Sequence, residues 1–174
     1  MQENIHFIDS DWSVFTDLIS LKKYSKIFVL VDTNTMNYCL PIFNPILNQE
    51  FEVIEVEPGE KSKDLEICAH IWSELSDQNV DRKSVIINLG GGVVSDLGSF
   101  VASIYKRGIN VINIPTSLLS MVDASIGAKC GIDFIGFKNQ LGSFKCVEGI
   151  FINAKFLETL PQVELISGLA EMLK

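Results

Sequence analysis

Short runs of apolar residues recur along the chain, and turn-forming residues follow each run. The runs that predict strands are 26–31, 51–56, 84–89 and 110–114. Most of them are continuous rather than alternating, which is typical of a parallel sheet buried on both faces. Asp32-Thr33-Asn34, Gly90-Gly91-Gly92 and Pro115 stand directly after three of the runs and mark their ends, and the first of these segments consists of turn and N-cap residues.

Helices are predicted between and after these runs. The segments with helical character are 62–78, 93–105 and 162–174, and Ser62 is the expected N-cap of the first. Strands that alternate with helices predict an α/β fold, with a Rossmann-like, mostly parallel sheet and helices on both faces. Ligands bind at the carboxyl ends of the strands in such sheets. The site is therefore expected where the glycine-rich and Asp/Thr/Asn segments follow the strands.

The composition fits a single globular domain. The chain has 174 residues, of which 47% are hydrophobic and 21% charged, and this is an ordinary size for one domain. No apolar run approaches the ~20 residues needed to cross a bilayer, and the N-terminus lacks the features of a secretion signal. The four cysteines show neither CxxC pairing nor metal-ligand spacing. We therefore expect reduced thiols in a cytoplasmic protein that has no membrane partner.

The charges indicate a small anionic ligand rather than a nucleic acid. A net charge of −8 argues against a nucleic-acid-binding surface. The basic residues beside Gly, Ser or Thr in expected loops are Lys61, Lys63, Lys106, Arg107, Lys129 and Lys138. In an acidic protein, this placement predicts local sites for an anionic small molecule.

The glycine run is the first candidate for such a site. Three glycines between a strand and a helix let the backbone approach a phosphate, and the helix N-terminus offers free N–H donors. The run is not GxGxxG, so the dinucleotide fingerprint does not apply as written. Asp96 is either an acid that interacts with the helix dipole or a ligand contact.

Other segments each allow a plain structural explanation and a functional one. The segment 57–63 is a solvated charged turn or part of a site, and 105–108 is a basic helix end capped by glycine or an anion contact. Asp123 and Lys129 stand among glycines and hydroxyls, which favours function. Glu171 and Lys174 share a helix face, either as a surface ion pair or with the carboxylate as one ligand of Zn²⁺.

In this order, the segments resemble the 3-dehydroquinate synthase family, among the sugar phosphate cyclases, over nearly the whole chain from Asp32 onward. The matching stretches are DTN at 32–34, PGEKSK at 58–63, GGGVVSDLGSF at 90–100, YKRGI at 105–109, PTSLLSMVDASIGAKCGID at 115–133, KN at 138–139, FLETLP at 156–161 and SGLAEMLK at 167–174. Each stretch alone is a weak signal, and the eight in register are a strong one.

The resemblance implies roles for individual residues. The implied NAD contacts are Asp32, Thr33, Asn34, Glu60, Lys63, Gly91, Gly92, Val93, Asp96, Thr116, Ser117, Lys138, Phe156 and Thr159. The implied substrate contacts are Arg107, Asp123, Lys129, Asn139 and Lys174, of which Lys129, Asn139 and Lys174 are also expected to be catalytic. Glu171 is similar to the carboxylate metal ligand of the family.

The resemblance also implies an activity. The family is a group of carbon–oxygen lyases that convert DAHP, a seven-carbon keto-acid sugar phosphate, to 3-dehydroquinate and phosphate in the shikimate pathway. They use NAD and a divalent metal, Zn²⁺ or Co²⁺, and tend to form homodimers. Family members take two metal-binding histidines from a downstream helical domain, whereas His6 and His70 lie outside every matching stretch. We therefore expect 1–174 to be the N-terminal NAD-binding domain of a larger enzyme, inactive alone, with the C-terminal metal domain absent from this chain.

Three alternatives remain open at this point. Another sugar phosphate cyclase, which makes an inosose or a valiolone, would share the NAD segments. A metal-dependent glycerol or alcohol dehydrogenase has a related architecture, but the segments 58–63 and 127–132 count against it. The third alternative is a protein without enzymatic activity, namely a standalone nucleotide-binding module.

Overall fold

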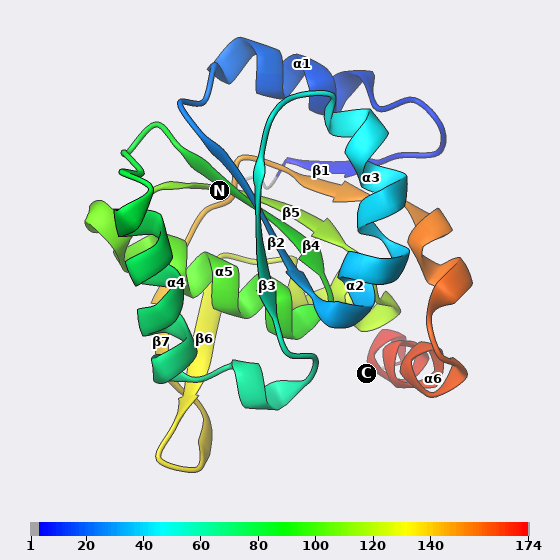
Figure 1. Ribbon diagram of the computed structural model, residues 1–174. Coiled ribbons are helices and arrows are strands. Elements are labelled where there is room, and N and C mark those ends of the chain that lie inside the picture. The colour runs from blue at the N-terminus through cyan, green and yellow to red at the C-terminus, as the bar shows by residue number, and fades with distance from the viewer. Residues whose placement is uncertain (1–3, 174) are drawn as a thin grey trace.

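A six-stranded parallel sheet forms the centre of the protein (Figure 1). The computed structural model describes residues 4–173. The strands are β1 (Ile5–Phe7), β2 (Ile27–Asp32), β3 (Glu52–Val56), β4 (Val85–Gly90), β5 (Asn110–Pro115) and β8 (Ile150–Ile152). Their order across the sheet is β1-β8-β5-β4-β2-β3, and every neighbouring pair is parallel.

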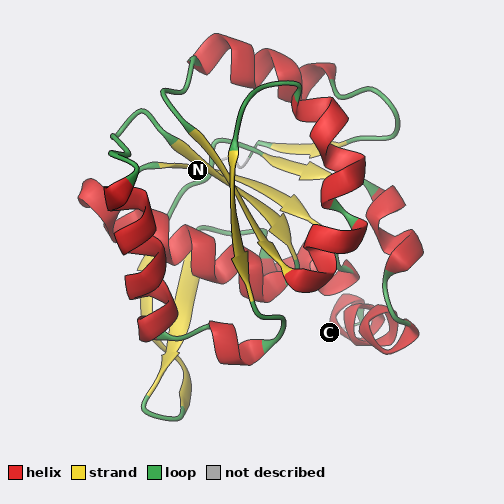
Figure 2. Ribbon diagram, viewed as in Figure 1, coloured by secondary structure: helices red, strands yellow, loops and turns green. Residues whose placement is uncertain are grey.

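Helices cover both faces of this sheet (Figure 2), and the alternation of side chains along β2 shows why. Val29 and Val31 pack into one apolar cluster with Phe15 of α1 (Ser13–Lys22) and Phe43 of α3 (Leu40–Leu47). The intervening Phe28 and Leu30 pack into a second cluster with α4 (Leu65–Asp77) and α5 (Gly92–Ile104). Successive strand residues point to opposite faces, so a continuously apolar strand needs a helical layer on each side. The predicted Rossmann-like α/β fold is confirmed.

The four predicted strands and the last two predicted helices agree with the structure to within two residues. The final helix, α6, spans Gln162–Met172. The short strands β1 and β8 and the helices α1 and α3 were not predicted. Within residues 4–173, no helix is both long and apolar enough to cross a membrane.

The predicted N-cap of the first helix is wrong. Ser62 belongs to the 3-10 turn η1 (Glu60–Ser62) and donates its hydroxyl to the carbonyl oxygen of Glu57 at 2.6 Å. The helix α4 begins later, because Asp64 has extended backbone and its carboxylate accepts from the N–H of Glu66 at 2.6 Å. Asp64 therefore satisfies an N–H group that the helix itself leaves without a partner.

The remaining elements are short turns and a hairpin. They include the short α-helix α2 (Thr33–Tyr38), the 3-10 turns η2 (Tyr105–Arg107) and η4 (Ala154–Thr159), and the π-helical turn η3 (Ser120–Ala124). The antiparallel strands β6 (Lys129–Phe134) and β7 (Phe137–Phe144) form a hairpin that packs against α5 and extends beyond the sheet (Figure 1). This hairpin, also not predicted, carries several of the predicted site residues.

Candidate functional site

The direction of the chain reverses between β2 and β4. From β2 the chain moves outward to β3 at one edge, and from β4 it moves the other way to β5. A crevice forms at such a switch point beyond the carboxyl ends of the two strands, and ligands bind there. Asp32 ends β2 and the glycine run follows β4, so topology places two of the predicted segments on either side of this crevice.

The glycine run forms a tight turn into the N-terminus of α5. Gly91 is the N-cap and supplies no side chain, so the first N–H groups of the helix remain available. A Cβ atom at Gly90 would lie 2.5 Å from Cβ of Val94, and one at Gly92 would lie 3.0 Å from Cβ of Ala124. Glycine is therefore needed for close packing at Gly90 and Gly92. Gly91, Gly92 and Val93 themselves are only partly buried, which leaves their main chain open to a ligand.

Asp32 is held in position by a capping box at the start of α2. Its Oδ1 accepts from the N–H of Thr35 at 2.8 Å, and its own N–H donates to Oγ1 of Thr35 at 2.9 Å. This agrees with the turn and N-cap role expected for the segment. Thr33 is partly buried and Asn34 is exposed on the same turn.

Thr116 and Ser117 flank the glycine run from the end of β5. The N–H of Thr116 donates to the carbonyl oxygen of Gly90 at 3.0 Å, which ties the two strand ends together. Oγ of Ser117 accepts from the N–H of Ser120 at 3.3 Å and would lie 3.3 Å from a Cβ at Gly91. Ser117 therefore caps the next turn and also borders the crevice.

A buried lysine connects the helix α5 to the hairpin. Lys63 is 4% exposed, and its Nζ lies 2.7 Å from Oδ2 of Asp96, 2.7 Å from Oδ1 of Asn139 and 3.5 Å from Oε1 of Glu60. Glu60 in turn accepts from Nζ of Lys138 at 3.2 Å. We call these five residues, Glu60, Lys63, Asp96, Lys138 and Asn139, the lysine network.

Asp96 does not act as a first-turn acid, one of the two roles considered for it. It lies beyond the first turn of α5, where the favourable interaction with the helix dipole has faded. Burial raises the pKa of its carboxyl group, and the hydrogen bond from Lys63 partly opposes that rise. Its main contact is therefore the ion pair with Lys63.

Three predicted residues lie apart from these two groups. Arg107 follows the far end of α5, a helix of 13 residues, and so about 20 Å from the glycine run. Phe156 is 2% exposed and packs edge-on against Trp12, so only its main chain could reach a ligand. Thr159 ends η4 and is exposed.

The remaining predicted residues lie on η3, on the hairpin and on α6. Lys129 begins β6 and Asp123 lies on η3, and both are exposed. Glu171 is partly buried on α6, which packs against η3. Lys174 lies outside the described residues. Among residues 4–173, no three His, Cys, Asp or Glu side chains cluster as a metal site would require.

The structure adds Asp133, a residue that the sequence analysis did not single out. Its Oδ1 accepts from the N–H of Asn139 at 2.8 Å, and its own N–H donates to the carbonyl oxygen of Lys63 at 2.8 Å. Asp133 ends the matching stretch 115–133, but only the hairpin turn brings it to Asn139. A hairpin prediction for this region would have been the signal to find it.

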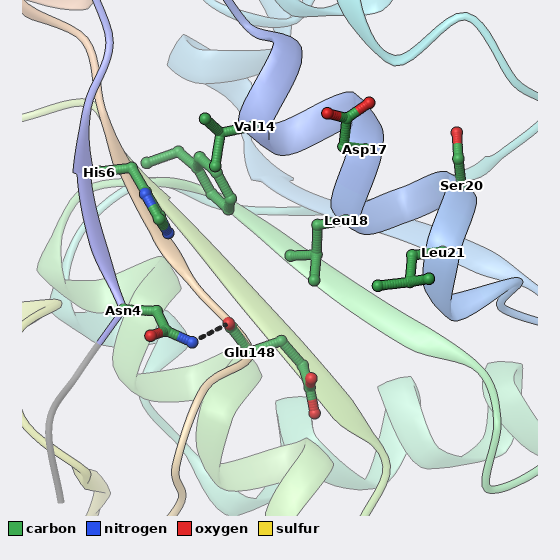
Figure 3. A pocket seen from close by; sticks show the side chains of 9 residues that line it. Asn4, His6, Val14, Asp17, Leu18, Ser20, Leu21 and Glu148 are labelled. Carbon is green, nitrogen blue, oxygen red and sulfur yellow. Dashed lines mark hydrogen bonds between the residues drawn. The ribbon is translucent and has the colours of Figure 1, made fainter.

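Two hollows on the surface lie away from these residues. A pocket of about 570 Å³ between α1 and β1 is lined by His6, Asp17, Leu18 and Glu148, among others (Figure 3). A groove of about 1040 Å³ runs beside α3, η3 and η4. Neither is lined by a residue predicted to contact cofactor or substrate.

The family described as "3-dehydroquinate synthase N-terminal" matches residues 53–167. The 3-dehydroquinate synthase of Parabacteroides distasonis is 43% identical over 163 residues, which are 93% of this chain and 46% of that protein. The chain thus spans about half the length of the curated relatives that it matches.

Solved structures of two synthases have a similar fold. A 2-deoxy-scyllo-inosose synthase complexed with carbaglucose-6-phosphate, NAD⁺ and Co²⁺ superposes with a TM-score of 0.86 at 19% identity, over 98% of this chain and 48% of that one. A 2-epi-5-epi-valiolone synthase from Streptomyces hygroscopicus, with NAD⁺ and Zn²⁺ bound, gives a TM-score of 0.80 at 26% identity, over 99% and 49%. The first likeness bears on the fold alone.

Proposed function

The chain belongs to the 3-dehydroquinate synthase family, and on that premise we propose that it is the NAD-binding part of an enzyme that converts DAHP to 3-dehydroquinate and phosphate. The observation that carries the proposal is the 43% identity to a 3-dehydroquinate synthase across 93% of the chain. The two cyclases of other specificity share 19% and 26% identity with it. The inosose and valiolone alternatives are therefore less well supported.

The glycine turn fits the pyrophosphate of a dinucleotide. Gly92 and Val93 are the first residues of α5, and no N-cap side chain occupies their N–H groups. Such a helix N-terminus favours an anion. Asp32, Thr116 and Ser117 supply acceptors and hydroxyls around it for the ribose groups. The bound NAD would supply reversible hydride transfer, and the protein holds it in place.

The hairpin fits the anionic substrate. Lys129 and Asn139, the predicted substrate contacts, lie on the two strands of the hairpin. Lys138, a predicted NAD contact, and Asn139 connect the hairpin to the cofactor segment 60–63. DAHP carries a carboxylate and a phosphate, and charge-assisted hydrogen bonds to such groups are worth about 1.5–3 kcal/mol each. In this proposal Asp123 contacts the substrate from η3, while Arg107 does not reach the same site within this chain.

The metal would be held only in part by the described residues. Glu171 offers one carboxylate, whereas a catalytic Zn²⁺ takes three protein ligands and leaves one position open. His6 stacks on Phe151 and His70 is exposed on α4, with no cluster of three potential ligands at either. We assign the other ligands, with Lys174 as a substrate contact, to residues beyond those described. The Zn²⁺ or Co²⁺ would polarise the oxygen of the oxidised alcohol. The proposed state is a cytoplasmic homodimer.

A fusion protein tests this proposal directly. Residues 1–174 replace the matching part of the Parabacteroides distasonis synthase, and phosphate release from DAHP is measured with NAD⁺ and Zn²⁺. We expect turnover by the fusion and none by the 174-residue chain alone. A Gly91→Val variant of the fusion should lose NAD⁺ binding and turnover, because its side chain would cover the N–H groups of the turn.

Two results would contradict the proposal. The first is a folded fusion that binds NAD⁺ and acts on another sugar phosphate but not on DAHP. The second is accumulation of NADH with an alcohol substrate, since a cyclase returns the hydride in every cycle and a dehydrogenase does not. Clear phosphate release by the chain alone would refute only the expectation that the chain is inactive by itself.

A further inference from the structure

Asn139 has a backbone conformation that the hairpin turn does not require. The turn is closed by Ile135 and Gly136, with φ of 51° and 77°. Asn139 lies three residues later within β7 and also has a left-handed φ, 50°. Asparagine adopts this conformation more readily than most non-glycine residues, but within a strand it interrupts the regular extended backbone. The pairing of β6 with β7 also shifts register between Ile132 and Phe134, directly opposite this region.

Asp133 holds this conformation in place. Its Oδ1 accepts from the backbone N–H of Asn139 at 2.8 Å, a group that the irregular pairing would otherwise leave without a strand partner. The N–H of Asp133 donates to the carbonyl oxygen of Lys63 at 2.8 Å. The backbone of Asn139 is therefore connected to Lys63 through one residue, Asp133, whose carboxylate binds Asn139 and whose N–H binds Lys63.

Lys63 fixes the side-chain amide of Asn139 as well. An ammonium group carries only donors, so the amide atom 2.7 Å from Nζ must be the oxygen, Oδ1. Nδ2 then points away from Lys63, and none of the residues 4–173 accepts a hydrogen bond from it in the structure. The lysine cannot swing away freely, because it is 4% exposed and also bonds Asp96 at 2.7 Å.

We propose that Asp133 and Lys63 are positioning residues that present Nδ2 of Asn139 as a fixed hydrogen-bond donor to an anionic oxygen of the substrate. The inference rests on the proposed function, in which Asn139 contacts the substrate, and it specifies which atom of Asn139 does so and what aims it. Asp133 sets the backbone, Lys63 sets the amide, and Asp96 holds Lys63. An amide presented in this way favours an acceptor such as a carboxylate or phosphate oxygen over a donor.

Amide hydrogen exchange on the 174-residue chain tests the role of Asp133. In Asp133→Ala, the N–H of Asn139 should exchange about tenfold faster or more, since it loses a bond to a charged acceptor. In Asp133→Asn, whose amide oxygen can still accept, most of the protection should remain. Asp77→Ala, which removes an exposed acid from the end of α4, is the control for loss of charge. Unchanged exchange in a folded Asp133→Ala variant would overturn the proposal.

The side-chain amide of Asn139 tests the role of Lys63. Lys63→Met should shift the Nδ2H₂ resonances of Asn139 in a nitrogen–proton correlation spectrum. In the Asp133 variants, which keep Lys63, Oδ1 of Asn139 should still face the ammonium group of Lys63. Resonances that stay in place in a folded Lys63→Met variant would remove Lys63 from the proposal. Should that variant fail to fold, Lys63→Gln keeps a donor and allows the same comparison.

Steady-state kinetics of the fusion protein separate positioning from folding. In Asp133→Ala, we expect kcat/KM for DAHP to fall by about 10- to 100-fold with the NAD⁺ affinity unchanged, and Asp133→Asn should restore most of it. Asn139→Asp should keep the contact with Lys63 yet lose turnover, because an acceptor replaces the outward donor. Equal losses in Asp133→Ala and Asp133→Asn would overturn the proposal. A fusion without activity even before substitution would refute the proposed function, and the exchange result would still stand.

Discussion

The glycine turn after β4 and the tip of the β6–β7 hairpin carry the two halves of the proposed site, and different forces hold them. The turn continues a strand in which every residue from Val85 to Gly90 is buried, so the close packing of the sheet and α5 fixes it. The tip is exposed, with Ile135 and Phe137 at 78% and 65% exposure. Polar contacts to Lys63 and Asp133 fix it instead.

This difference determines how each half can fail. Packing is shared by many side chains, so a single polar substitution should not move the glycine turn. The hairpin depends on a few hydrogen bonds around one buried lysine, and loss of a partner in such a group leaves a polar atom unsatisfied. The cofactor side is thus expected to be robust and the substrate side sensitive to single changes.

Phenylalanine truncation should give the largest contrast between the packed sheet and the hairpin. Phe15 is fully buried and makes edge contacts with Trp12, Phe43 and Phe151, so Phe15→Ala should reduce the free energy of unfolding by about 3–5 kcal/mol. Phe144→Ala on the hairpin should change it by less than about 0.5 kcal/mol. Urea unfolding followed by circular dichroism measures both, and similar losses would contradict the comparison.

Removal of the buried ammonium should have the next largest effect. Lys63→Met leaves the carboxylate of Asp96, 22% exposed, without its partner. The cost should be about 2–3 kcal/mol, less than the roughly 3–5 kcal/mol for a fully buried pair. The substitution should also raise the pKa of Asp96 further, since the hydrogen bond from Lys63 now opposes the effect of burial. Carbon NMR titration of the Asp96 carboxyl group measures this pKa, and a fall would contradict the assigned contact.

The sign of the pH dependence follows from that raised pKa. Folded Asp96 holds its proton more tightly than the unfolded chain does, so its contribution to stability falls as the pH rises from the ordinary value of 3.8 through the folded pKa. In Lys63→Met, the decline should extend to higher pH. Unfolding free energies measured at several pH values, with Lys61→Met on the exposed side of η1 as control, test the direction.

A methyl group added in the core should have a smaller effect. A Cβ at Gly98 would lie 1.8 Å from Oδ1 of Asn88, itself buried and bonded through Nδ2 to Asn113 at 2.8 Å. Gly98→Ala should therefore cost about 1–3 kcal/mol through overpacking. Gly142→Ala in β7, where the methyl would lie 3.1 Å from the carbonyl oxygen of Cys130, should cost less. Thermal unfolding measures the stability of both variants, and a larger loss in Gly142→Ala than in Gly98→Ala would contradict this prediction.

Thiol labelling of the unsubstituted protein should distinguish the buried cysteines from the exposed one that follows the hairpin. Burial raises the pKa of Cys39 and Cys130 to about 11 and that of Cys68 to about 12, so these thiols should resist alkylation at pH 8. Cys146, exposed just after the hairpin, should react first. Mass spectrometry after a short exposure to iodoacetamide counts the labels, and rapid labelling of Cys68 in the folded chain would contradict the packing described.

The sequence predicted the elements whose signal is local. Strands β2, β4 and β5 are continuous apolar runs, and the segment after β2 caps α2 through Asp32, as its composition indicates. Strands β1 and β8 have three residues each, too few for a periodic pattern to be recognised. The hairpin was missed because its glycines and polar residues read as a loop.

The residues of the site also divide into those that a local sequence signal predicts and those that depend on tertiary packing. The glycine turn, Asp32 and the hydroxyls of Thr116 and Ser117 follow strand ends, so their position could be predicted from topology. The partner of Asp96 could not, because the choice between the helix dipole and a distant lysine depends on how α5 packs. The N-cap at Ser62 was wrong for a similar reason, since a 3-10 turn delays the start of α4 to follow Asp64.

By itself, the sequence determined the α/β class, the family and the glycine turn, because hydrophobic patterning and short motifs act between near neighbours in the chain. Only the tertiary structure decided that Lys63 is buried and that it turns the amide of Asn139, a residue 76 positions away. A hydrogen bond between side chains forms only when the donor–acceptor distance is correct to within a few tenths of an ångström. Such distances are set when helix and hairpin pack together, and no local pattern specifies them.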